Sequence, residues 1–236
     1  MPFDKNTEHL ITLDVEALYS NIPQEATLEV RCELLERNVN DSRTPPEYIL
    51  DRAHLALTRN YFEFENQFFL QTQGTSMGST FAPSLACLYV DNFEKKVVLH
   101  EDNPYLEHIR LWKRYIDDIL PIWAGSRDEA HSFITWLNME NPFLTFTMTI
   151  GNDQLPFLDL LIHESDGVLA TEVYQKPTDR NNLLQFKSFH PRSLRENLPV
   201  GQFLRLQRNC SKVSDYHKHA NALSAKLLER ESTPTM

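Results

Sequence analysis

The 236-residue chain has little cysteine and glycine, and it lacks a surplus of basic residues. Its cysteines, Cys32, Cys87 and Cys210, are far apart and form no C-x-x-C pair, which argues against a disulfide framework and a zinc site. No apolar run approaches the roughly 18–20 residues of a transmembrane helix, and the start, MPFDKNTEHL, lacks the features of a signal peptide. These absences predict a soluble, intracellular protein without membrane association.

The charge balance disfavours a protein that binds only phosphate groups. The formal net charge is −10, from 23 basic and 33 acidic residues, whereas proteins that depend on phosphate contacts usually carry a basic surplus. A basic channel on an acidic body remains compatible with these numbers. Hydrophobic residues make up 41% and charged residues 24% of the chain, which is the composition of a globular protein with a substantial core.

Strand-like and helix-like segments alternate along the chain, which predicts an α+β fold with a mainly antiparallel sheet. Glu65-Asn66 is placed to form the turn of an aromatic hairpin. A shift in composition near Lys176–Arg192 suggests a small second unit, which is expected to be helical and more basic after Pro191. The expected strands cover residues 9–15, 61–73, 108–123, 143–150, 155–163 and 168–175, and the expected helices cover 20–38, 46–60, 82–100, 128–138 and the region after Pro191.

Two adjacent aspartates, Asp117 and Asp118, interrupt the apolar run RYIDDIL. Aspartate tolerates turn geometry, so one interpretation is an ordinary tight turn. However, Asp14 ends the apolar strand ITLDV in a similar setting. Three carboxylates at strand ends can converge on hard cations, and two Mg²⁺ ions can assist phosphoryl transfer.

A second motif suggests different chemistry. GTSMG matches the G-x-S-x-G nucleophile elbow of serine hydrolases, with Ser76 as nucleophile and Asp159 and His190 in the required chain order. Few strand candidates precede Ser76, and no H-G-G-type oxyanion segment is present upstream. An alternative role for Asp159 is to face the open side of a strand.

Three ordered segments resemble motifs A, B and C of reverse transcriptases: LDVEALYSNIP, QGTSMGSTFAPSLACLYVDNFE and RYIDDIL. The amino-acid sequences of these segments, together with the later QKPTDR and SFHP, are similar to those of Penelope-like retroelements, which are relatives of telomerase reverse transcriptase. The resemblance implies an RNA-directed DNA polymerase with the right-hand architecture. It implies a palm over residues 1–176, whose antiparallel sheet is flanked by helices, and a partial helical thumb over 177–236.

The resemblance also implies roles for individual residues. Asp14 and Asp117 would hold two Mg²⁺ ions, with Asp118 as the third acid. Tyr19 would lie under the incoming sugar, where its ring would clash with a 2′-hydroxyl. Gln73 and Gly74 would lie along the nucleotide and template.

The implied partners are an RNA template, a DNA primer and deoxynucleoside triphosphates, and the implied location is the nucleus. LPFLDLLIH resembles the primer-grip hairpin. Basic residues of the thumb-like segment would contact the nucleic-acid backbone: Arg192, Arg195, Arg205, Arg208 and Lys212.

The sequence departs from the family in three respects, one of which is that TFTMTIGNDQ has no obvious lysine to protonate the pyrophosphate. It begins almost at the first motif, so the fingers segments and the GIY-YIG endonuclease of the family are not part of it. A non-enzymatic remnant with residual nucleic-acid binding is therefore an alternative. Pro121 follows the aspartates in the expected strand, and proline is expected only at sheet edges or bulges.

Overall fold

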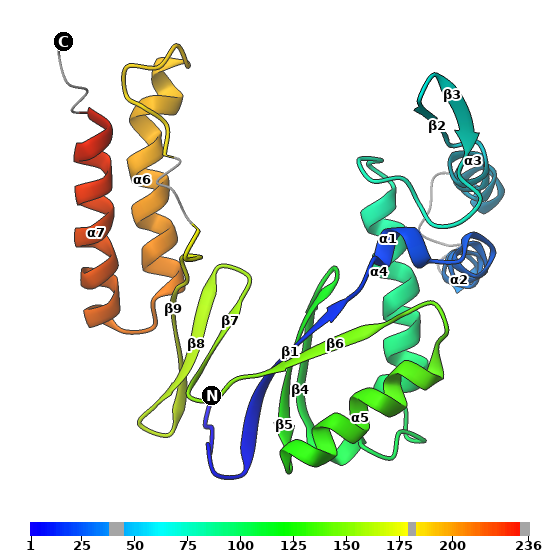
Figure 1. The fold of residues 1–236 in the computed structure, drawn as a ribbon, viewed down its shortest axis with the longest axis horizontal. Coiled ribbons are helices and arrows are strands. Elements are labelled where there is room, and N and C mark those ends of the chain that lie inside the picture. Colours follow the sequence, from blue (N-terminus) through cyan, green and yellow to red (C-terminus); the bar gives the residue numbers. More distant parts are fainter. Residues whose placement is uncertain (38–44, 179–182, 232–236) are drawn as a thin grey trace. The chain divides into compact units, whose positions relative to one another are not determined.

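The computed structural model describes residues 1–37, 45–178 and 183–231. It divides into two compact units, one formed by residues 11–150 and the other by residues 1–10 with 151–236 (Figure 1). Each unit contains antiparallel strand pairs and helices, which confirms the predicted α+β class. The assignment of residues 1–176 to a palm and of residues 177–236 to a thumb remains a prediction. Part of the predicted thumb, including Asp179 and Arg180 of QKPTDR, lies outside the described residues.

Residues 11–150 are organised around a four-stranded sheet with the order β4-β5-β1-β6. β1 pairs antiparallel with β6, and β4 pairs antiparallel with β5 through a tight turn that sets Tyr115 opposite Asp118. A separate hairpin forms from β2 and β3. The strands are β1 (Glu8–Val15), β2 (Tyr61–Phe64), β3 (Gln67–Leu70), β4 (Ile109–Tyr115), β5 (Asp118–Ala124) and β6 (Phe146–Ile150).

The helices of this unit follow the predicted segments closely. α5 begins with a capping box, in which the Ser126 hydroxyl accepts from the Glu129 backbone N–H and the Glu129 carboxylate accepts from Ser126. α4 continues into a π-helical turn, Glu94–Val98. The helices are α1 (Leu18–Asn21), α2 (Gln24–Arg37), α3 (Pro46–Thr58), α4 (Ala82–Phe93) and α5 (Arg127–Glu140), with a short 3-10 turn at Leu106–His108.

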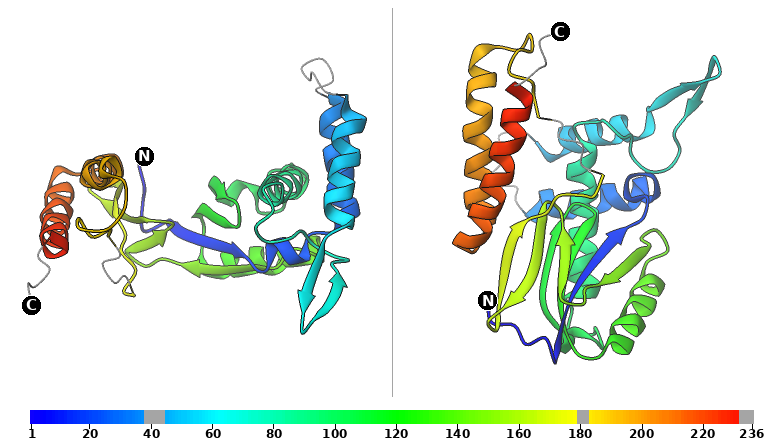
Figure 2. Two further views of the ribbon diagram at one scale, coloured as in Figure 1. Left: turned by 90° about the horizontal axis from the view of Figure 1, so that it is seen from above. Right: turned by 60° about the vertical axis from the view of Figure 1, so that its left-hand side comes forward.

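The core of residues 11–150 lies between the sheet and helices α4 and α5, which cover one of its faces (Figure 2). Alternate residues of β1 point into this core, because side chains in a strand alternate between the two faces. Trp123 of β5 stacks on Phe133 of α5 with ring centroids 5.2 Å apart, and both rings are almost fully buried. The face with α4 and α5 is therefore the buried one, and the even-numbered residues of β1 near its end face the other way.

Pro121 lies one residue pair from an irregularity of the β4–β5 register between Ile109 and Leu111, so a bulge is nearby although the proline itself is in a regular pair. It lies in β5 opposite Trp112, and β5 is bonded on one side to β4 and on the other to β1, so this proline is not in an edge strand. Antiparallel partners alternate between hydrogen-bonded and non-bonded pairs. Counting from the Tyr115–Asp118 pair that closes the turn, the Trp112–Pro121 pair falls on a non-bonded position. The missing N–H therefore lies on the side of β5 that faces β1, and the β4–β5 ladder loses no donor.

The other unit contains a three-stranded sheet and two long helices. β7 (Gln154–Phe157), β8 (Leu160–Ser165) and β9 (Val168–Val173) form an antiparallel meander. α6 (Arg192–Asn209) and α7 (Val213–Glu231) contact each other and β9. Asp159 lies in the β7–β8 turn rather than on the open face of a strand, because LPFLDLLIH forms a hairpin with Leu158 at a positive φ of 54°.

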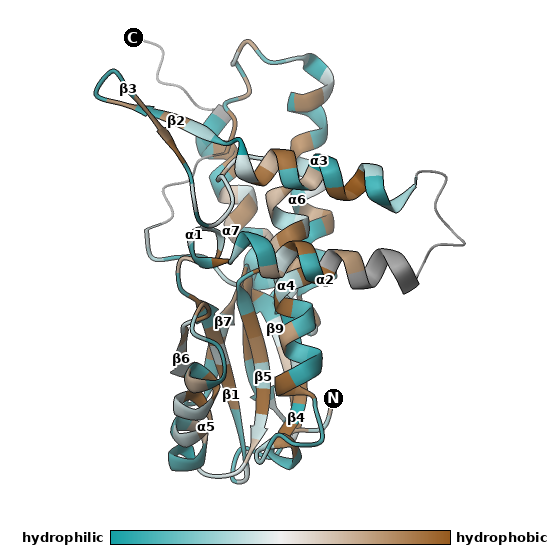
Figure 3. Ribbon diagram, turned by 90° about the vertical axis from the view of Figure 1, so that its right-hand side faces the viewer, coloured by the Kyte–Doolittle hydropathy of each residue, from teal (hydrophilic) through white to brown (hydrophobic). Residues whose placement is uncertain are grey.

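The β2–β3 hairpin confirms the predicted turn at Glu65-Asn66. Both turn residues have positive φ, 49° and 58°, as a two-residue hairpin turn of this type requires. All eight strand residues are exposed, including Phe62 and Phe69, whose ring centroids lie 5.5 Å apart in a stacked arrangement. Figure 3 shows β3 of this hairpin coloured largely as hydrophobic. No helix in the described ranges is long and apolar enough to span a bilayer.

Candidate functional site

Three elements of residues 11–150 meet where β1 ends. The backbone N–H of Val15 donates to the carbonyl of Asp117 at 3.2 Å, which joins the end of β1 to the β4–β5 turn. Helix α1 begins three residues after Val15 and carries Tyr19. The structure therefore brings together parts of two sequence motifs that are about a hundred residues apart.

The pleat of the sheet decides where the acidic side chains point. Leu13 and Val15 are buried in the core, so Asp14 between them projects from the opposite face and is exposed. In β5 the same alternation buries Ile119 and places Asp118 on the open face. Asp14 and Asp118 thus share the open face of the sheet, while Asp117 lies in the turn at its end.

Asp14, next to Val15, lies within the electrostatic reach of Asp117. The pKa of Asp14 is raised above its ordinary value, first because the surrounding protein reduces its hydration and then because of the negative charges of Asp117 and Glu16. The pKa of Tyr19 is raised by partial burial and then by the charge of Asp117, among others. Asp117 therefore acts on both residues through its field.

This pair of carboxylates suits a divalent cation. Mg²⁺ commonly takes one or two protein carboxylates and completes its octahedral shell with water and substrate phosphates. Within the described part of the chain, no three His, Cys, Asp or Glu side chains are grouped closely enough to hold a metal ion by themselves. The structure thus joins Asp14 with Asp117 and places Asp118 on the same face. The three-carboxylate site remains a prediction.

The turn that carries Asp117 is strained. Ile116 has φ of 59°, a left-handed conformation that is a genuine outlier for a β-branched residue. Such conformations cost about 1–3 kcal/mol and persist only where the surroundings impose them. They are frequent at functional sites, which supports the choice of this turn as part of the site.

The loop that carries Gln73 and Gly74 is bonded to α1. The N–H of Thr75 donates to the carbonyl of Tyr19 at 2.7 Å, and the N–H of Gly74 donates to the carbonyl of Ile22 at 3.1 Å. The exposed Gln73 donates its side-chain amide to Asn21 at 3.4 Å. The predicted nucleotide-contacting residues Tyr19, Gln73 and Gly74 are therefore neighbours in space.

Gly74 is required at this contact. Its φ is +72°, and a Cβ atom at this position would lie 2.4 Å from the carbonyl oxygen of Tyr19 and 2.6 Å from that of Ser20. Real Cβ atoms essentially never approach other atoms so closely, and these are backbone atoms. The close approach therefore fixes the distance between the loop and α1.

Most of the basic residues predicted to contact nucleic acid have partners within their own unit. Arg192 pairs with Glu196 one helical turn away, and Arg205 pairs with Asp159. Arg195 donates to the carbonyl of Phe186 and lies over its ring, and Lys212 contacts Ser165 and Asp166. Arg208 is exposed in the last turn of α6. Their role in binding nucleic acid remains a prediction.

The structure gives no support to the hydrolase alternative. β1–β6 and β4–β5 are antiparallel, unlike the mostly parallel hydrolase sheet. Ser76 lies in the loop before α4, and its carbonyl accepts from Ser79. The proposed triad partners have other contacts, because His190 bonds the Ser188 hydroxyl and Asp159 pairs with Arg205.

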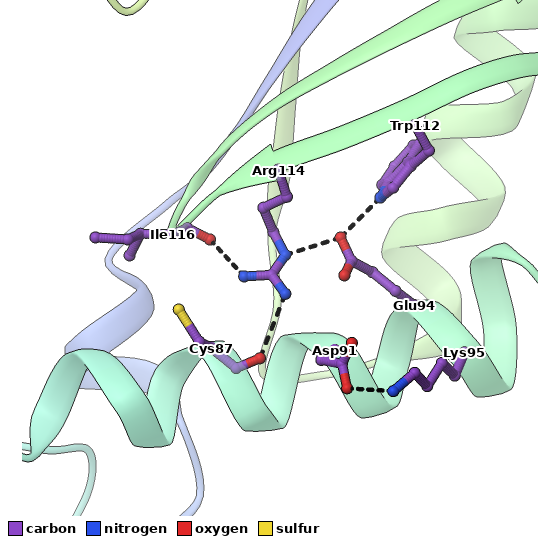
Figure 4. Close-up of polar contacts among 7 residues, drawn as sticks. All are labelled: Cys87, Asp91, Glu94, Lys95, Trp112, Arg114 and Ile116. Atoms are coloured by element: carbon purple, nitrogen blue, oxygen red, sulfur yellow. Dashed lines mark hydrogen bonds and ion pairs between the residues drawn. The ribbon is translucent and has the colours of Figure 1, made fainter.

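Sequence reasoning missed a buried polar cluster behind the turn (Figure 4). Arg114 donates from Nε to the Glu94 carboxylate at 2.8 Å, and Trp112 donates to the same oxygen at 2.7 Å. Arg114 also donates to the carbonyls of Ile116 and Cys87. The sequence signal that could have indicated this cluster is the spacing of Trp112 and Arg114, which places both side chains on the same face of the expected strand.

Comparisons with known proteins agree with a polymerase-like fold. Similar structures include telomerase from Candida albicans in complex with a fragment of telomeric RNA, with TM-score 0.67, 14% identity and 94% of this chain covered. Apo telomerase from Candida tropicalis matches with TM-score 0.58, 14% identity and 98% coverage. The RNA-dependent RNA polymerase of a Sicinivirus matches with TM-score 0.51, 14% identity and 98% coverage.

This chain spans 39%, 42% and 49% of those three structures, respectively. At such identities the likeness concerns the fold alone. The model of the animal helix-turn-helix domain matches residues 182–234, which include α6 and α7. Curated proteins contain no match to the sequence.

Proposed function

We propose that the chain is the catalytic core of an RNA-directed DNA polymerase of the Penelope-like type, with residues 11–150 as the centre of its palm. The observation that carries the proposal is the Asp14–Asp117 pair, formed where the end of β1 meets a strained turn. The fold likeness to telomerase and a viral RNA polymerase supports it. The motif resemblance supplies the choice of an RNA template and a DNA product.

Each residue of the site has a specific role in this proposal. Asp14 and Asp117, with Asp118 on the same face, would hold two Mg²⁺ ions. Bound there, the ions would neutralise charge on the triphosphate and activate the primer 3′-hydroxyl. The oxygen of that hydroxyl would form the new bond to the α-phosphate, and the bond from the α-phosphate to pyrophosphate would break. The partly buried ring of Tyr19 limits the space beside the sugar and so favours deoxynucleotides.

The loop bearing Gln73 and Gly74 would follow the nucleotide and template, because its bonds to α1 keep it beside Tyr19. The basic side chains on α6 and at its end would contact the phosphate backbone of a primer–template duplex. The telomerase of Candida albicans, a structural neighbour, is in complex with RNA. A nuclear location follows from the same proposal.

Magnesium-dependent primer extension on a primed RNA template tests the proposal. Asp117→Asn should reduce extension by about 10²–10³-fold, the loss typical of removing one charge-stabilising group from an active site. Glu101→Gln is the matched control: Glu101 is exposed in the connection between α4 and β4, and its change should leave the rate within about twofold of the unmodified chain.

The outcomes separate the enzyme from the remnant. Extension that is lost in Asp117→Asn and kept in Glu101→Gln supports the polymerase. No extension by a folded chain that still binds an RNA–DNA duplex favours the non-enzymatic remnant. Folding is checked by circular dichroism in every case.

A further inference from the structure

Arg114 lies directly behind the turn that carries Asp117. It is the last inward-facing residue of β4, because the pleat places it on the same face as Trp112, towards α4. Its side chain is only 11% exposed, and that of Glu94, its partner, is 10% exposed. A charged arginine is rarely so buried without a defined set of partners.

The guanidinium uses its donors in three directions. Nε donates to Glu94 at 2.8 Å, one terminal nitrogen donates to the carbonyl of Ile116 at 3.2 Å, and the other donates to the carbonyl of Cys87 at 3.3 Å (Figure 4). The first and last partners belong to the π-helical turn and to α4, which pack in the core against the sheet. The remaining partner is the strained residue of the turn.

Glu94 makes this arrangement possible. It begins the π-helical turn at the end of α4, and its carboxylate accepts from both Arg114 and Trp112. The carboxylate balances the buried cation, and the second donor fixes its orientation. π-helical turns within α-helices are frequent at functional sites.

Ile116 is the residue that needs an external restraint. A positive φ at a β-branched residue is maintained only when the surroundings impose it. Its carbonyl is held by Arg114, and the next residue is Asp117. If this carbonyl were released, the turn could relax towards ordinary geometry, and the carboxylate of Asp117 would move away from Asp14.

We propose that Arg114 is a positioning residue. Through its bond to the Ile116 carbonyl, and supported by Glu94, it holds the strained turn so that Asp117 stays beside Asp14. The proposal rests on the proposed function for its consequence in catalysis, but the restraint itself concerns the turn alone. It assigns a role to a charged pair that touches none of the reacting atoms.

The chemistry of arginine explains why lysine should not replace it. Guanidinium presents five donors in a rigid planar fork, whereas an ammonium group is a compact point charge. Arg114→Lys keeps the positive charge beside Glu94 but cannot reach Glu94, Ile116 and Cys87 together. Arg110→Lys is the matched control, because Arg110 lies in the same strand and is exposed.

The test uses three readouts on the full chain. Hydrogen–deuterium exchange of the Tyr115–Asp118 amides reports on the turn. Mn²⁺ titration followed by electron paramagnetic resonance reports on the carboxylates. Primer-extension kinetics separate kcat from KM.

For Arg114→Lys we expect amide exchange in the turn at least about tenfold faster and Mn²⁺ affinity lower by about tenfold. We also expect kcat lower by about 10–10²-fold with KM within about twofold, because a misplaced catalytic group affects the chemical step more than binding. Arg110→Lys should match the unmodified chain in all three readouts.

A second variant controls for the possibility that Arg114→Lys misfolds. Arg114→Met with Glu94→Gln leaves no unpaired buried charge and keeps an acceptor for Trp112, so it should fold while showing the same faster exchange in the turn. Unchanged exchange in a folded variant of either kind would overturn the positioning role. If the unmodified chain neither binds Mn²⁺ nor extends a primer, the proposed function fails, while the exchange result still decides the role of Arg114.

Discussion

Gly74→Ala should destabilise residues 11–150 far more than an ordinary glycine replacement. Alanine in the left-handed conformation that Gly74 adopts, φ +72°, costs about 1–2 kcal/mol. In addition, its Cβ would lie 2.4–2.7 Å from backbone atoms of Tyr19 and Ser20, which cannot rotate away. The loop must then separate from α1.

Separation breaks two backbone hydrogen bonds, from Thr75 to Tyr19 and from Gly74 to Ile22. Gly74 and Thr75 are buried, and each lost bond of this kind costs about 1 kcal/mol. We therefore expect the free energy of unfolding to fall by about 3–4 kcal/mol. Because Tyr19 moves with α1, primer extension should fall as well.

Gly78→Ala is the matched control. Gly78 lies in the same loop with φ +94°, and a Cβ there meets no atom within 4 Å. Only the conformational cost of about 1–2 kcal/mol applies to it. The difference between the two variants therefore measures the contact with α1.

Urea unfolding followed by tryptophan fluorescence is the appropriate assay. Trp112, Trp123 and Trp136 all lie in residues 11–150, so their signal reports the unit that contains Gly74. Equal free energies of unfolding for the two alanine variants, within about 0.5 kcal/mol, would refute the close-approach argument.

Two predictions concern pH. The folded-state pKa of Asp14 is raised, so the charge of Asp14 disfavours folding above that pKa. Asp14→Asn should therefore raise the free energy of unfolding at pH 7 by less than about 1 kcal/mol after solvent screening, and it should abolish primer extension. A gain in stability that persists at pH 3 in urea unfolding would contradict this. Burial alone would raise the pKa of Glu172, but hydrogen bonds from His219 and Lys218 outweigh it and lower the pKa below 4.5, so Glu172 contributes stability above pH 4.5 that disappears as the pH falls through its folded-state pKa. Glu172→Gln should therefore lower the free energy of unfolding by about 1 kcal/mol at pH 7 and by progressively less as the pH falls through the folded-state pKa of Glu172, measured by circular dichroism at 222 nm. A loss independent of pH would disprove this reasoning.

Local sequence signals were sufficient for most elements. Glu65-Asn66 predicted a hairpin turn because asparagine tolerates positive φ, and the structure has positive φ at Asn66 and also at Glu65. The α5 segment carried its own start signal, Ser126 with Glu129 three residues later. Such signals depend on residues within one or two turns of each other, so a sequence displays them directly.

The turn that divides LPFLDLLIH into strands β7 and β8 was less predictable from the sequence. LPFLDLLIH is apolar except for Asp159 and His163, and its turn at Leu158-Asp159 has none of the glycine or asparagine that usually marks a hairpin turn. Asp159 therefore looked like a strand residue, although it pairs with Arg205 from α6. An ion pair between residues 46 positions apart has no local signature.

The sequence alone determined the α+β class, the elements and the candidate carboxylates, because periodicity, turn residues and unusual acids in apolar strands are local properties. The tertiary structure decided that Asp14 and Asp117 are neighbours and that Asp118 shares a face with Asp14. It also revealed the bonds of Arg114 to Glu94 and to the Ile116 carbonyl. These facts depend on strand order, pleat and a strained backbone angle, which arise only when distant segments pack against one another.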